Sequence, residues 1–282
     1  MHTTIIDVAT LAAHLQDPSW LPIDCRFDLA NPSAGERAFA EGHIPGSMYA
    51  HLDRDLASPI TPMTGRHPLP DPQTFAELLG RWGVTPETQV IAYDGDNGMY
   101  ASRLWWMLRW VGHPRVAVLD GGFRAWSDAG LPATQELVTR SPTRFVARPD
   151  HSMWVDAAFV DRVRSAREWR ILDARAPERF RGEVEPIDRI AGHVPGARNH
   201  PFAKNMGSSG RLAPADELHR AFETSQAGVA DDHTIAMCGS GVTACHLLLG
   251  LEIAGKRGAK LYPGSWSEWI RDAAHPVAKN EG

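Results

Sequence analysis

The sequence predicts an α/β protein of two tandem domains, each a mainly parallel β-sheet flanked by helices. Three observations predict it. The two halves of the chain carry the same landmarks in the same order. Within each half, short apolar runs alternate with helical patterns. The length of 282 residues is also sufficient for two domains of about 140 residues, each able to bury its own core.

The repeat is the most specific of these observations. Its landmarks recur at a nearly constant offset of roughly 142 to 150 residues, which indicates duplicated domains and not a solenoid of short units. The matching segments are 24–26 and 173–175, 41–47 and 191–197, 90–95 and 234–239, and 118–122 and 260–264. We therefore expect domains at 1–136 and 152–282, joined by a linker at 137–151, where apolar residues are few and neither periodicity holds.

The apolar runs at 90–94 and 234–238 are typical of buried parallel strands. Each precedes a glycine-containing loop and then a predicted helix, at 101–111 and 243–254, with Gly112 and Gly255 where helices commonly end. Ligands of parallel sheets bind beyond the carboxyl ends of the strands. This topology therefore puts Asp94 and Cys238 at functional edges of their sheets.

Composition excludes several classes of protein. Apolar residues make up 43% and charged residues 22%, and the formal net charge is −5, so no broad basic face is expected for nucleic acid or an anionic membrane. No apolar stretch approaches the length of a membrane span, and the first residues lack the pattern of a secretory signal. Three cysteines in so long a chain argue against a disulfide framework and for a reducing, cytoplasmic location.

The residues around Cys238 indicate nucleophilic sulfur chemistry. Cys238 follows a buried strand, and the loop after it opens a helix, so inward-facing backbone N–H groups and the helix N-terminus favour an anion there. Such a cysteine is expected to be a thiolate and to hold a persulfide. The other loop residues are expected to help bind the substrate: Gly239, Gly241, Val242 and Thr243. The alternative for Cys238 is a small buried residue at the end of a strand.

The remaining cysteines and the matching loop carry no comparable signal. Cys25 and Cys245 lack a glycine-rich loop, and we interpret both as core residues, with a redox role as the alternative for Cys245. Asp94 stands where Cys238 stands in the second half. Because a carboxylate is a poor sulfur carrier, the first domain is expected to support the site without repeating its chemistry.

Cysteine-based phosphatases are one rival, since they hold an oxyanion in a loop of Cys, five residues and Arg. Here Ala244 stands at the arginine position, and no arginine occurs between Cys238 and Lys256. The bidentate donor that phosphoryl transfer requires is therefore missing from the loop.

Four features together resemble the two-domain rhodanese and 3-mercaptopyruvate sulfurtransferase family, over nearly the whole chain. They are the tandem repeat, the GHIPG and GHVPG turns at 42–46 and 192–196, the loop CGSGVTA at 238–244, and the segment YPGSWSEW at 262–269. Members that prefer thiosulfate carry two cations beside the cysteine. Here Gly239 and Ser240 stand in those places, which resembles the mercaptopyruvate enzymes.

The resemblance also implies roles for residues that spacing alone would not select. It implies a proton relay of Ser240, His67 and Asp53 beside the nucleophile Cys238. It implies Arg179 as the arginine that holds the donor carboxylate. The family's second arginine would stand at Asp188, in a segment two residues shorter than usual, and we expect the neighbouring Arg189 to take that role.

Other prominent side chains are interpreted as structural. His43 and His193 occur in both halves, which favours a hydrogen bond that stabilises the turn. The tryptophans at 105, 106, 110, 266 and 269 are interpreted as packing residues, one of which could wall the pocket.

The sequence thus predicts an enzyme that moves sulfur from 3-mercaptopyruvate through a Cys238 persulfide to an acceptor thiol, thioredoxin or cyanide. No metal or organic cofactor is implied. Three alternatives remain: an enzyme that prefers thiosulfate, a sulfur carrier with little turnover of its own, and a phosphatase.

Overall fold

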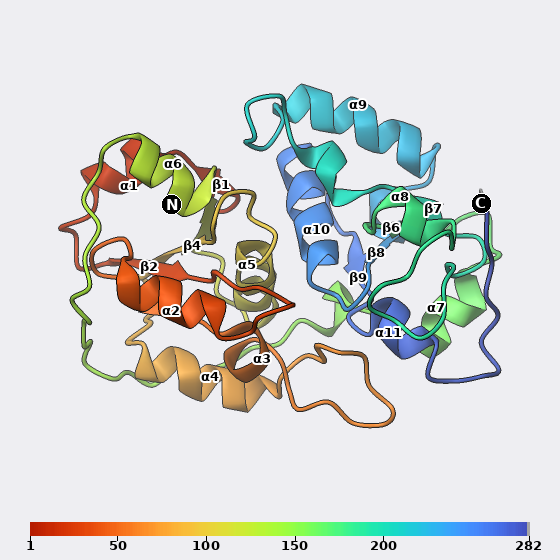
Figure 1. Ribbon diagram of the computed structural model, residues 1–282, viewed down its shortest axis with the longest axis horizontal. Coiled ribbons are helices and arrows are strands. Elements are labelled where there is room, and N and C mark those ends of the chain that lie inside the picture. The colour runs from red at the N-terminus through yellow and green to blue at the C-terminus, as the bar shows by residue number, and fades with distance from the viewer. Residues whose placement is uncertain (281–282) are drawn as a thin grey trace. The chain divides into compact units, whose positions relative to one another are not determined.

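The computed structural model describes residues 1–280, which form two compact units (Figure 1). Unit 1 comprises Met1–Ser58, Leu69–Asp150 and Ser209–Leu212, and unit 2 comprises Pro59–Pro68, His151–Ser208 and the described residues from Ala213 onward. The segment Pro59–Pro68 comes from the first half of the sequence, yet it belongs to unit 2. That assignment brings two side chains of this segment, Arg66 and His67, to the candidate site of unit 2.

Unit 1 contains a five-stranded sheet in the order β1-β5-β4-β2-β3, and every pairing is parallel. Its strands are β1 (Ile5–Ile6), β2 (Trp20–Asp24), β3 (Met48–Tyr49), β4 (Gln89–Tyr93) and β5 (Val116–Leu119). Its helices are α1 (Val8–Ala13), α2 (Ala34–Glu41), α3 (Leu52–Asp55), α4 (Pro72–Arg81), α5 (Ala101–Trp110) and α6 (Gly122–Asp128).

Unit 2 contains a four-stranded parallel sheet in the order β7-β6-β8-β9. Its strands are β6 (Arg170–Asp173), β7 (Arg198–Asn199), β8 (Thr234–Met237) and β9 (Lys260–Leu261). Its helices are α7 (Ala157–Val163), α8 (Pro177–Phe180), α9 (Ala215–Gln226), α10 (Thr243–Ile253) and α11 (Ser265–Trp269), with short 3₁₀ turns at His151–Met153, Phe202–Asn205 and Asp231–His233.

The two sheets share one topology, as the repeat predicts. Strands β2, β3, β4 and β5 correspond to β6, β7, β8 and β9, and a parallel bridge from Trp154 to Leu261 takes the place of β1. The fold class predicted from the sequence is confirmed. The two predicted helices end within one residue of their expected bounds, and Gly112 and Gly255 follow them with φ of +88° and +78°.

One detail of the predicted repeat is wrong by one residue. The sequence pairs Val118 with Lys260, but the sheet registers pair Ala117 with Ile91 and Lys260 with Ile235, so Ala117 is the counterpart of Lys260. By the same shift, the counterpart of Gly122 is Ser265 and not Gly264. The sequence alone could not find this shift, because the segment between the strands differs in length between the two halves.

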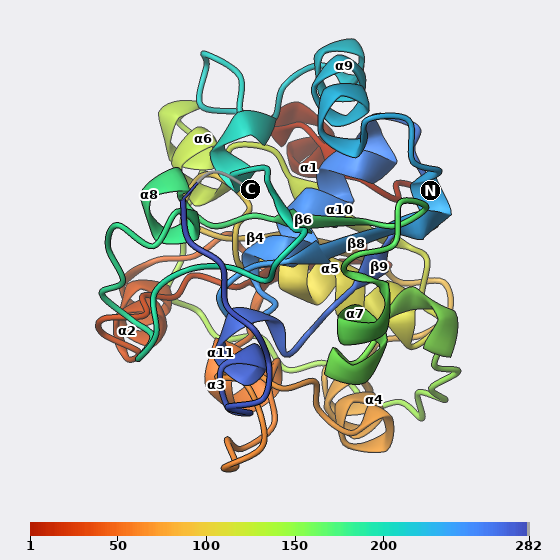
Figure 2. The same cartoon turned by 90° about the vertical axis from the view of Figure 1, so that its right-hand side faces the viewer.

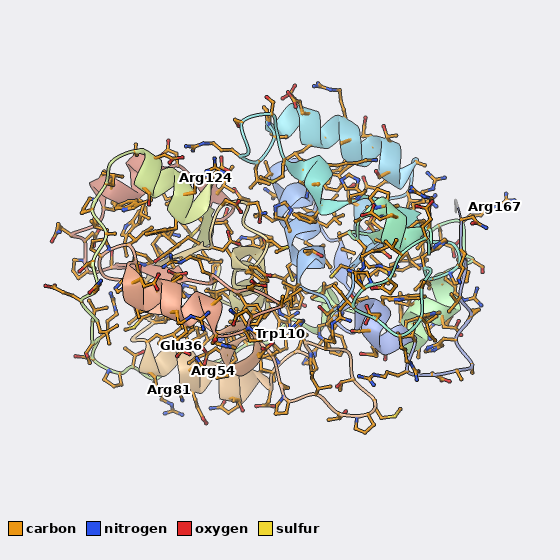
Figure 3. All side chains as sticks on the ribbon, in the orientation of Figure 1. Glu36, Arg54, Arg81, Trp110, Arg124 and Arg167 are labelled. Atoms are coloured by element: carbon orange, nitrogen blue, oxygen red, sulfur yellow. The ribbon has the colours of Figure 1, made fainter. Side chains whose placement is uncertain are left out.

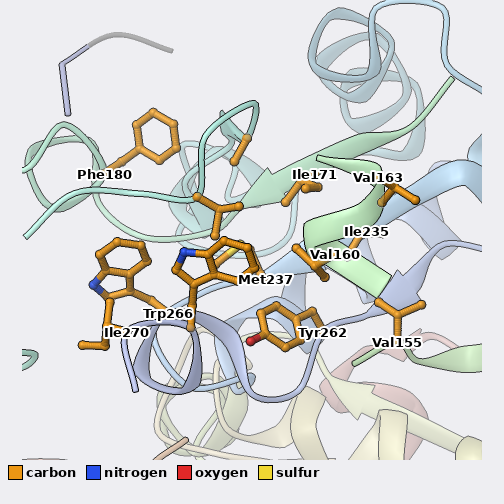
Figure 4. Packing of buried hydrophobic residues seen from close by; sticks show 13 residues of the cluster. Val155, Val160, Val163, Ile171, Phe180, Ile235, Met237, Tyr262, Trp266 and Ile270 are labelled. Atoms are coloured by element: carbon orange, nitrogen blue, oxygen red, sulfur yellow. The ribbon is translucent and has the colours of Figure 1, made fainter. Parts of the chain in front are cut away.

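Each sheet is buried on both faces, as a parallel sheet requires. In unit 2, α9 and α10 lie on one face, and α7 and α11 lie on the other (Figure 2). Val160 of α7 and Trp266 and Trp269 of α11 pack with Ile235 and Met237 of β8 in one apolar cluster (Figure 4). The end of β8, where Cys238 follows, is therefore fixed by a rigid core.

The GHIPG turn at 42–46 and the GHVPG turn at 192–196 are stabilised in the same way. Arg26 pairs with Asp24 at 2.6 Å and donates to the Gly42 carbonyl, and Arg175 pairs with Asp173 at 2.7 Å and donates to the Gly192 carbonyl. Each pair therefore connects its turn to the end of the strand that precedes it, β2 in unit 1 and β6 in unit 2.

His43 and His193 lie in these turns. Their Nδ1 atoms bond the carbonyls of Phe39 and Phe180 at 2.8 and 2.7 Å, and each imidazole stacks on that phenylalanine. The hydrogen bond expected in each turn is confirmed.

The segment 137–150 is extended and belongs to unit 1, where Arg140 donates to the Pro18 carbonyl and Thr143 to the Val84 carbonyl.

Ion pairs on the surface, such as Arg54 with Glu36 at 2.9 Å, contribute little to stability (Figure 3). Among residues 1–280, no helix is long and apolar enough to cross a membrane.

Candidate active site

Cys238 stands directly after β8 and points into the loop that it begins. Its Sγ accepts a hydrogen bond from the Gly241 N–H at 3.1 Å, and the residue is only 2% exposed. Gly241 has φ of +77°, and a Cβ there would lie 2.3 Å from the Pro263 carbonyl oxygen. Only glycine permits this turn and the close approach to the next segment, so the loop can curl around the sulfur.

The segment after β9 holds this loop in place. The Ser265 hydroxyl accepts the Cys238 N–H at 3.0 Å and donates to the Tyr262 carbonyl at 2.8 Å. The N–H groups of Trp266 and Ser267 donate to the Cys238 and Gly239 carbonyls at 3.0 and 2.9 Å. With its backbone fixed on both sides, the cysteine presents its sulfur in one orientation.

Ser265 is a backbone outlier with φ of +53°, a region that costs a residue other than glycine about 1 to 3 kcal/mol. Its counterpart in unit 1 is Gly122, with φ of +56°. The hydroxyl that accepts the Cys238 N–H gives a physical reason for a serine at a position where unit 1 has glycine.

Ser240 and His67 form a buried pair beside the nucleophile. The Ser240 Oγ and His67 Nδ1 atoms lie 2.8 Å apart, and the two residues are 5% and 4% exposed. The segment that carries His67 is fastened to unit 2, because the Arg66 N–H donates to the Ser267 hydroxyl at 3.0 Å and Arg271 donates to the Thr64 carbonyl at 3.2 Å. The structure thus brings together two residues that are 173 positions apart.

The third residue of the expected relay is Asp53. It lies in α3 of unit 1, where its N–H donates to the His51 Nδ1 at 3.1 Å. Its participation with Ser240 and His67 stays a prediction from the family resemblance.

Two guanidinium groups lie against the loop at Gly239. A Cβ built on Gly239 would come within 2.9 Å of Arg66 Nη2 and 3.7 Å of both Nη atoms of Arg179. Arg179, in α8, was expected near the loop, whereas Arg66 was not. Arg189 contributes none of the three nearest atoms, and its guanidinium donates instead to the Ile270 and Arg271 carbonyls at the end of α11.

These arginines belong to a chain of alternating charges. It runs from Asp173 through Arg175, Glu185, Arg179 and Asp188 to Arg66, with Arg175–Glu185 at 3.4 Å, Arg179–Glu185 at 2.6 Å and Arg179–Asp188 at 3.2 Å. Burial raises the pKa of Asp188, although Arg66 opposes the shift. Burial disfavours the charge of Arg175, but its pair with Asp173 outweighs this and raises the pKa of the guanidinium.

The other cysteines lie in the core. Burial raises the pKa of Cys25 far above that of an ordinary thiol, so it is a poor nucleophile. The Cys245 thiol donates to the Gly241 carbonyl at 3.3 Å and so braces the loop from beneath. Val242 and Thr243 begin α10. Within the part of the chain that the structure describes, no three His, Cys, Asp or Glu side chains cluster as metal ligands would.

The arrangement can stabilise an anionic sulfur, move a proton through a hydroxyl and an imidazole, and bind an anion through two guanidiniums. Sequence reasoning missed Arg66, Ser265 and Ser267 as parts of this site. Residue 66 directly precedes His67 in the GRHPLP segment, and both serines lie within YPGSWSEW, so the available signal was proximity to motifs already singled out.

The chain is similar to known proteins over both of its units. The model of the rhodanese-like domain matches twice, at residues 7–129 and 157–272. A protein of Pseudomonas aeruginosa named "Probable 3-mercaptopyruvate sulfurtransferase" is 47% identical over 279 residues, which cover 98% of each chain. The thiosulfate sulfurtransferase of Gallus gallus is 34% identical over 261 residues, which cover 91% of this chain and 86% of that protein.

Among solved structures, the 3-mercaptopyruvate sulfotransferase SseA of Escherichia coli superposes with a TM-score of 0.80 and 34% identity. The match covers 95% of this chain and all of that one. The two matches of the domain model fall one in each half of the chain, and the superposition covers 95% of it, so the resemblance includes both units.

Proposed function

The chain belongs to the rhodanese-like domain family, and we propose that it is a sulfurtransferase that takes sulfur from 3-mercaptopyruvate onto Cys238 and passes it to a thiol or to cyanide. The observation that carries the proposal is the Cys238 sulfur turned into its own loop, 3.1 Å from the Gly241 nitrogen, beside the Ser240–His67 pair. A buried core cysteine would have neither a backbone donor for its anion nor a proton relay at its side.

In the first half-reaction, the Cys238 thiolate attacks the sulfur of the donor. A sulfur–sulfur bond forms, the carbon–sulfur bond of the donor breaks, and its electron pair remains on carbon as the enolate of pyruvate. The thiol proton of the donor, relayed by Ser240 and His67 with Asp53 as the third member, ends on that carbon. Pyruvate leaves and Cys238 holds a persulfide anion, which the loop N–H groups stabilise.

In the second half-reaction, an acceptor attacks the outer sulfur and releases the Cys238 thiolate. An acceptor thiolate becomes a persulfide, and cyanide becomes thiocyanate. A dithiol protein of the thioredoxin type would then use its second thiol to release sulfide and close its own disulfide. All three cysteines of the chain are free, which suits a reducing compartment such as the cytoplasm.

Recognition of the donor is proposed to rest on charge. Mercaptopyruvate carries one carboxylate, and the guanidinium of Arg179 lies next to Gly239, close to where that carboxylate would sit when its sulfur meets Cys238. A bidentate contact between guanidinium and carboxylate would orient the donor for attack.

Thiosulfate is the second candidate donor, and a specific observation favours it. Two guanidiniums, those of Arg66 and Arg179, lie near Gly239, and a dianion would benefit from both. Against it, Asp188 and Glu185 neutralise these cations, which leaves little net positive charge for a dianion.

The deciding experiment compares kcat/KM for the two donors on the purified protein, with cyanide as acceptor in both assays. We expect mercaptopyruvate to be preferred, and Cys238→Ser to lose turnover with either donor. Full turnover by Cys238→Ser would refute the mechanism, and a preference for thiosulfate would replace the first donor by the second.

A further inference from the structure

The family resemblance implies a second arginine that helps to bind the donor, but Asp188 stands at its position. Asp188 lies in the segment 181–197, between α8 and β7. The Asp188 side chain is only 5% exposed, and both of its carboxylate oxygens contact arginines of the site: Oδ1 contacts Arg66 and Oδ2 contacts Arg179. A buried carboxylate at this point would repel a donor carboxylate unless neighbouring cations outweighed it. The structure supplies one such cation from a different segment.

Arg66 has capacity for a further anionic partner. Its Nη1 contacts Asp188, its Nη2 faces Gly239, and its buried Nε–H has no hydrogen-bond partner among the residues that the structure describes. A guanidinium presents five donors, and a buried donor without a partner is rare in folded proteins. Its side chain is 22% exposed, so solutes can reach it.

Gly239 explains how Arg66 reaches the loop. Any side chain at 239 would place its Cβ 2.9 Å from Arg66 Nη2, so the end of the Arg66 side chain would have to move away from its present position. A cation carried by the loop itself and the guanidinium of Arg66 would therefore compete for one space. This chain has glycine in the loop and an arginine delivered from the segment Pro59–Pro68.

We propose that Arg66 is a donor-binding residue, which together with Arg179 holds the donor carboxylate above Gly239, while Asp188 is the internal counter-ion that Arg66 contacts when no donor is bound. The assignment deepens the proposed function and rests on it. It replaces the expectation that Arg189 fills this role, because the Arg189 guanidinium donates to backbone carbonyls at the end of α11.

The test uses two donors that differ only in the carboxylate: 3-mercaptopyruvate and mercaptoacetone, its analogue with a methyl group instead. The purified variants are Arg66→Gln and, as a matched control, Arg181→Gln, whose arginine pairs with Glu183 at the surface. We expect Arg66→Gln to lower kcat/KM for mercaptopyruvate about 10- to 100-fold, mainly through KM, as loss of a charge-assisted contact does. Mercaptoacetone and the control variant should change less than about threefold.

An equal loss with both donors would assign Arg66 a structural role and overturn the proposal, and so would no loss with either donor. A loss of selectivity in Arg189→Gln but not in Arg66→Gln would restore the earlier expectation. Failure of the proposed function itself looks different, because the unaltered protein would then not turn over mercaptopyruvate at all.

Asp188→Asn gives an independent test that does not depend on the stability of Arg66→Gln. Removing the internal counter-ion should lower KM for mercaptopyruvate about 2- to 10-fold and leave mercaptoacetone unchanged, because the carboxylate no longer competes with Asp188 for the arginines. A higher KM for mercaptopyruvate in this variant would contradict the proposal.

Discussion

The loops after β4 and β8 occupy the same place in the two units, yet their backbone N–H groups bond different side chains. In unit 1, the Asp94 carboxylate accepts the N–H groups of Gly98, Tyr100 and Ala101 at 2.9, 2.8 and 3.2 Å. In unit 2, the Cys238 sulfur accepts the Gly241 N–H at 3.1 Å. The loop of unit 1 thus surrounds the Asp94 carboxylate, which cannot carry sulfur. The loop of unit 2 surrounds the Cys238 sulfur, which can form a bond to a substrate and break it again.

The surroundings of the two loops match more closely than their contents. In unit 1, the N–H groups of Phe123 and Arg124 donate to the Asp94 and Gly95 carbonyls at 2.8 and 2.9 Å, as their counterparts do in unit 2. In both units, the strand, the loop and the following helix together form a site that favours an anion. Whether this site stabilises the fold or carries out chemistry depends on the first residue of the loop, which is Asp94 in unit 1 and Cys238 in unit 2.

The largest expected effect is the loss of turnover when Cys238 is replaced, and it tests whether this residue serves the chemistry or the fold. Cys238→Ala should lower turnover with mercaptopyruvate by on the order of 1,000-fold or more, because the sulfur-carrying nucleophile is gone. Its melting temperature should stay within a few degrees, since only one small side chain is lost. Steady-state rates and a thermal melt on the same preparation measure both. A large loss of stability would mean that Cys238 serves the fold.

Asp94→Ala should show the opposite pattern. It leaves several buried N–H groups without an acceptor, and we expect the free energy of unfolding to fall by about 4 kcal/mol. Denaturant unfolding measures the loss, and Asp94→Asn, which keeps one acceptor oxygen, should lose less. If Asp94→Ala unfolded at the same denaturant concentration as the unaltered protein, the carboxylate would not be what holds this loop.

The two units should also differ at a second pair of corresponding positions, where only unit 2 has a residue that makes stability depend on pH. His200 in unit 2 corresponds to Ala50 in unit 1, because their N–H groups donate to the Asp173 and Asp24 carbonyls. Burial lowers the pKa of His200 to about 4. Between pH 6.5 and 4 the unfolded chain therefore binds a proton at this residue that the folded chain does not. The free energy of unfolding should decrease by up to about 3 kcal/mol as the pH is lowered through this range.

His200→Gln should remove this part of the pH dependence and leave the rest. Melting temperatures measured from pH 7.5 to 4.5 should fall less steeply in the variant than in the unaltered protein. Parallel curves for the two proteins would show that His200 does not contribute to acid sensitivity.

The smallest expected effect concerns the strained serine. Ser265→Gly copies Gly122 of unit 1, relieves the unfavourable φ of +53°, and removes the hydroxyl that accepts the Cys238 N–H. The two changes in stability should nearly cancel, within about 1 kcal/mol. We expect kcat to fall about 2- to 10-fold, because the orientation of Cys238 is less fixed. An unchanged kcat would mean that the hydroxyl serves only the fold.

The sequence was sufficient wherever the signal was local or repeated. The two sheets, the helices after β4 and β8, and the loop of Cys238 follow from apolar runs, glycines and a constant offset. The hydrogen bonds of His43 and His193 in the two turns could be expected because both histidines occur at the same place in the repeat.

What the sequence did not reveal depends on contacts between distant segments. Nothing near Arg66 indicates that Pro59–Pro68 packs against a loop that begins at residue 238, or that Asp188 would meet it there. The one-residue shift that makes Ser265 the counterpart of Gly122 emerges only from sheet register and hydrogen bonds. Charge pairing and strain of this kind are properties of the folded chain.

The most direct test of the account is the position of the transferred sulfur. The protein is exposed to mercaptopyruvate without an acceptor, and its intact mass and peptides are measured before and after addition of cyanide. The account predicts one added sulfur atom, located on Cys238 and removed by cyanide. Added sulfur on Cys25 or Cys245, or turnover without any sulfur on Cys238, would contradict it.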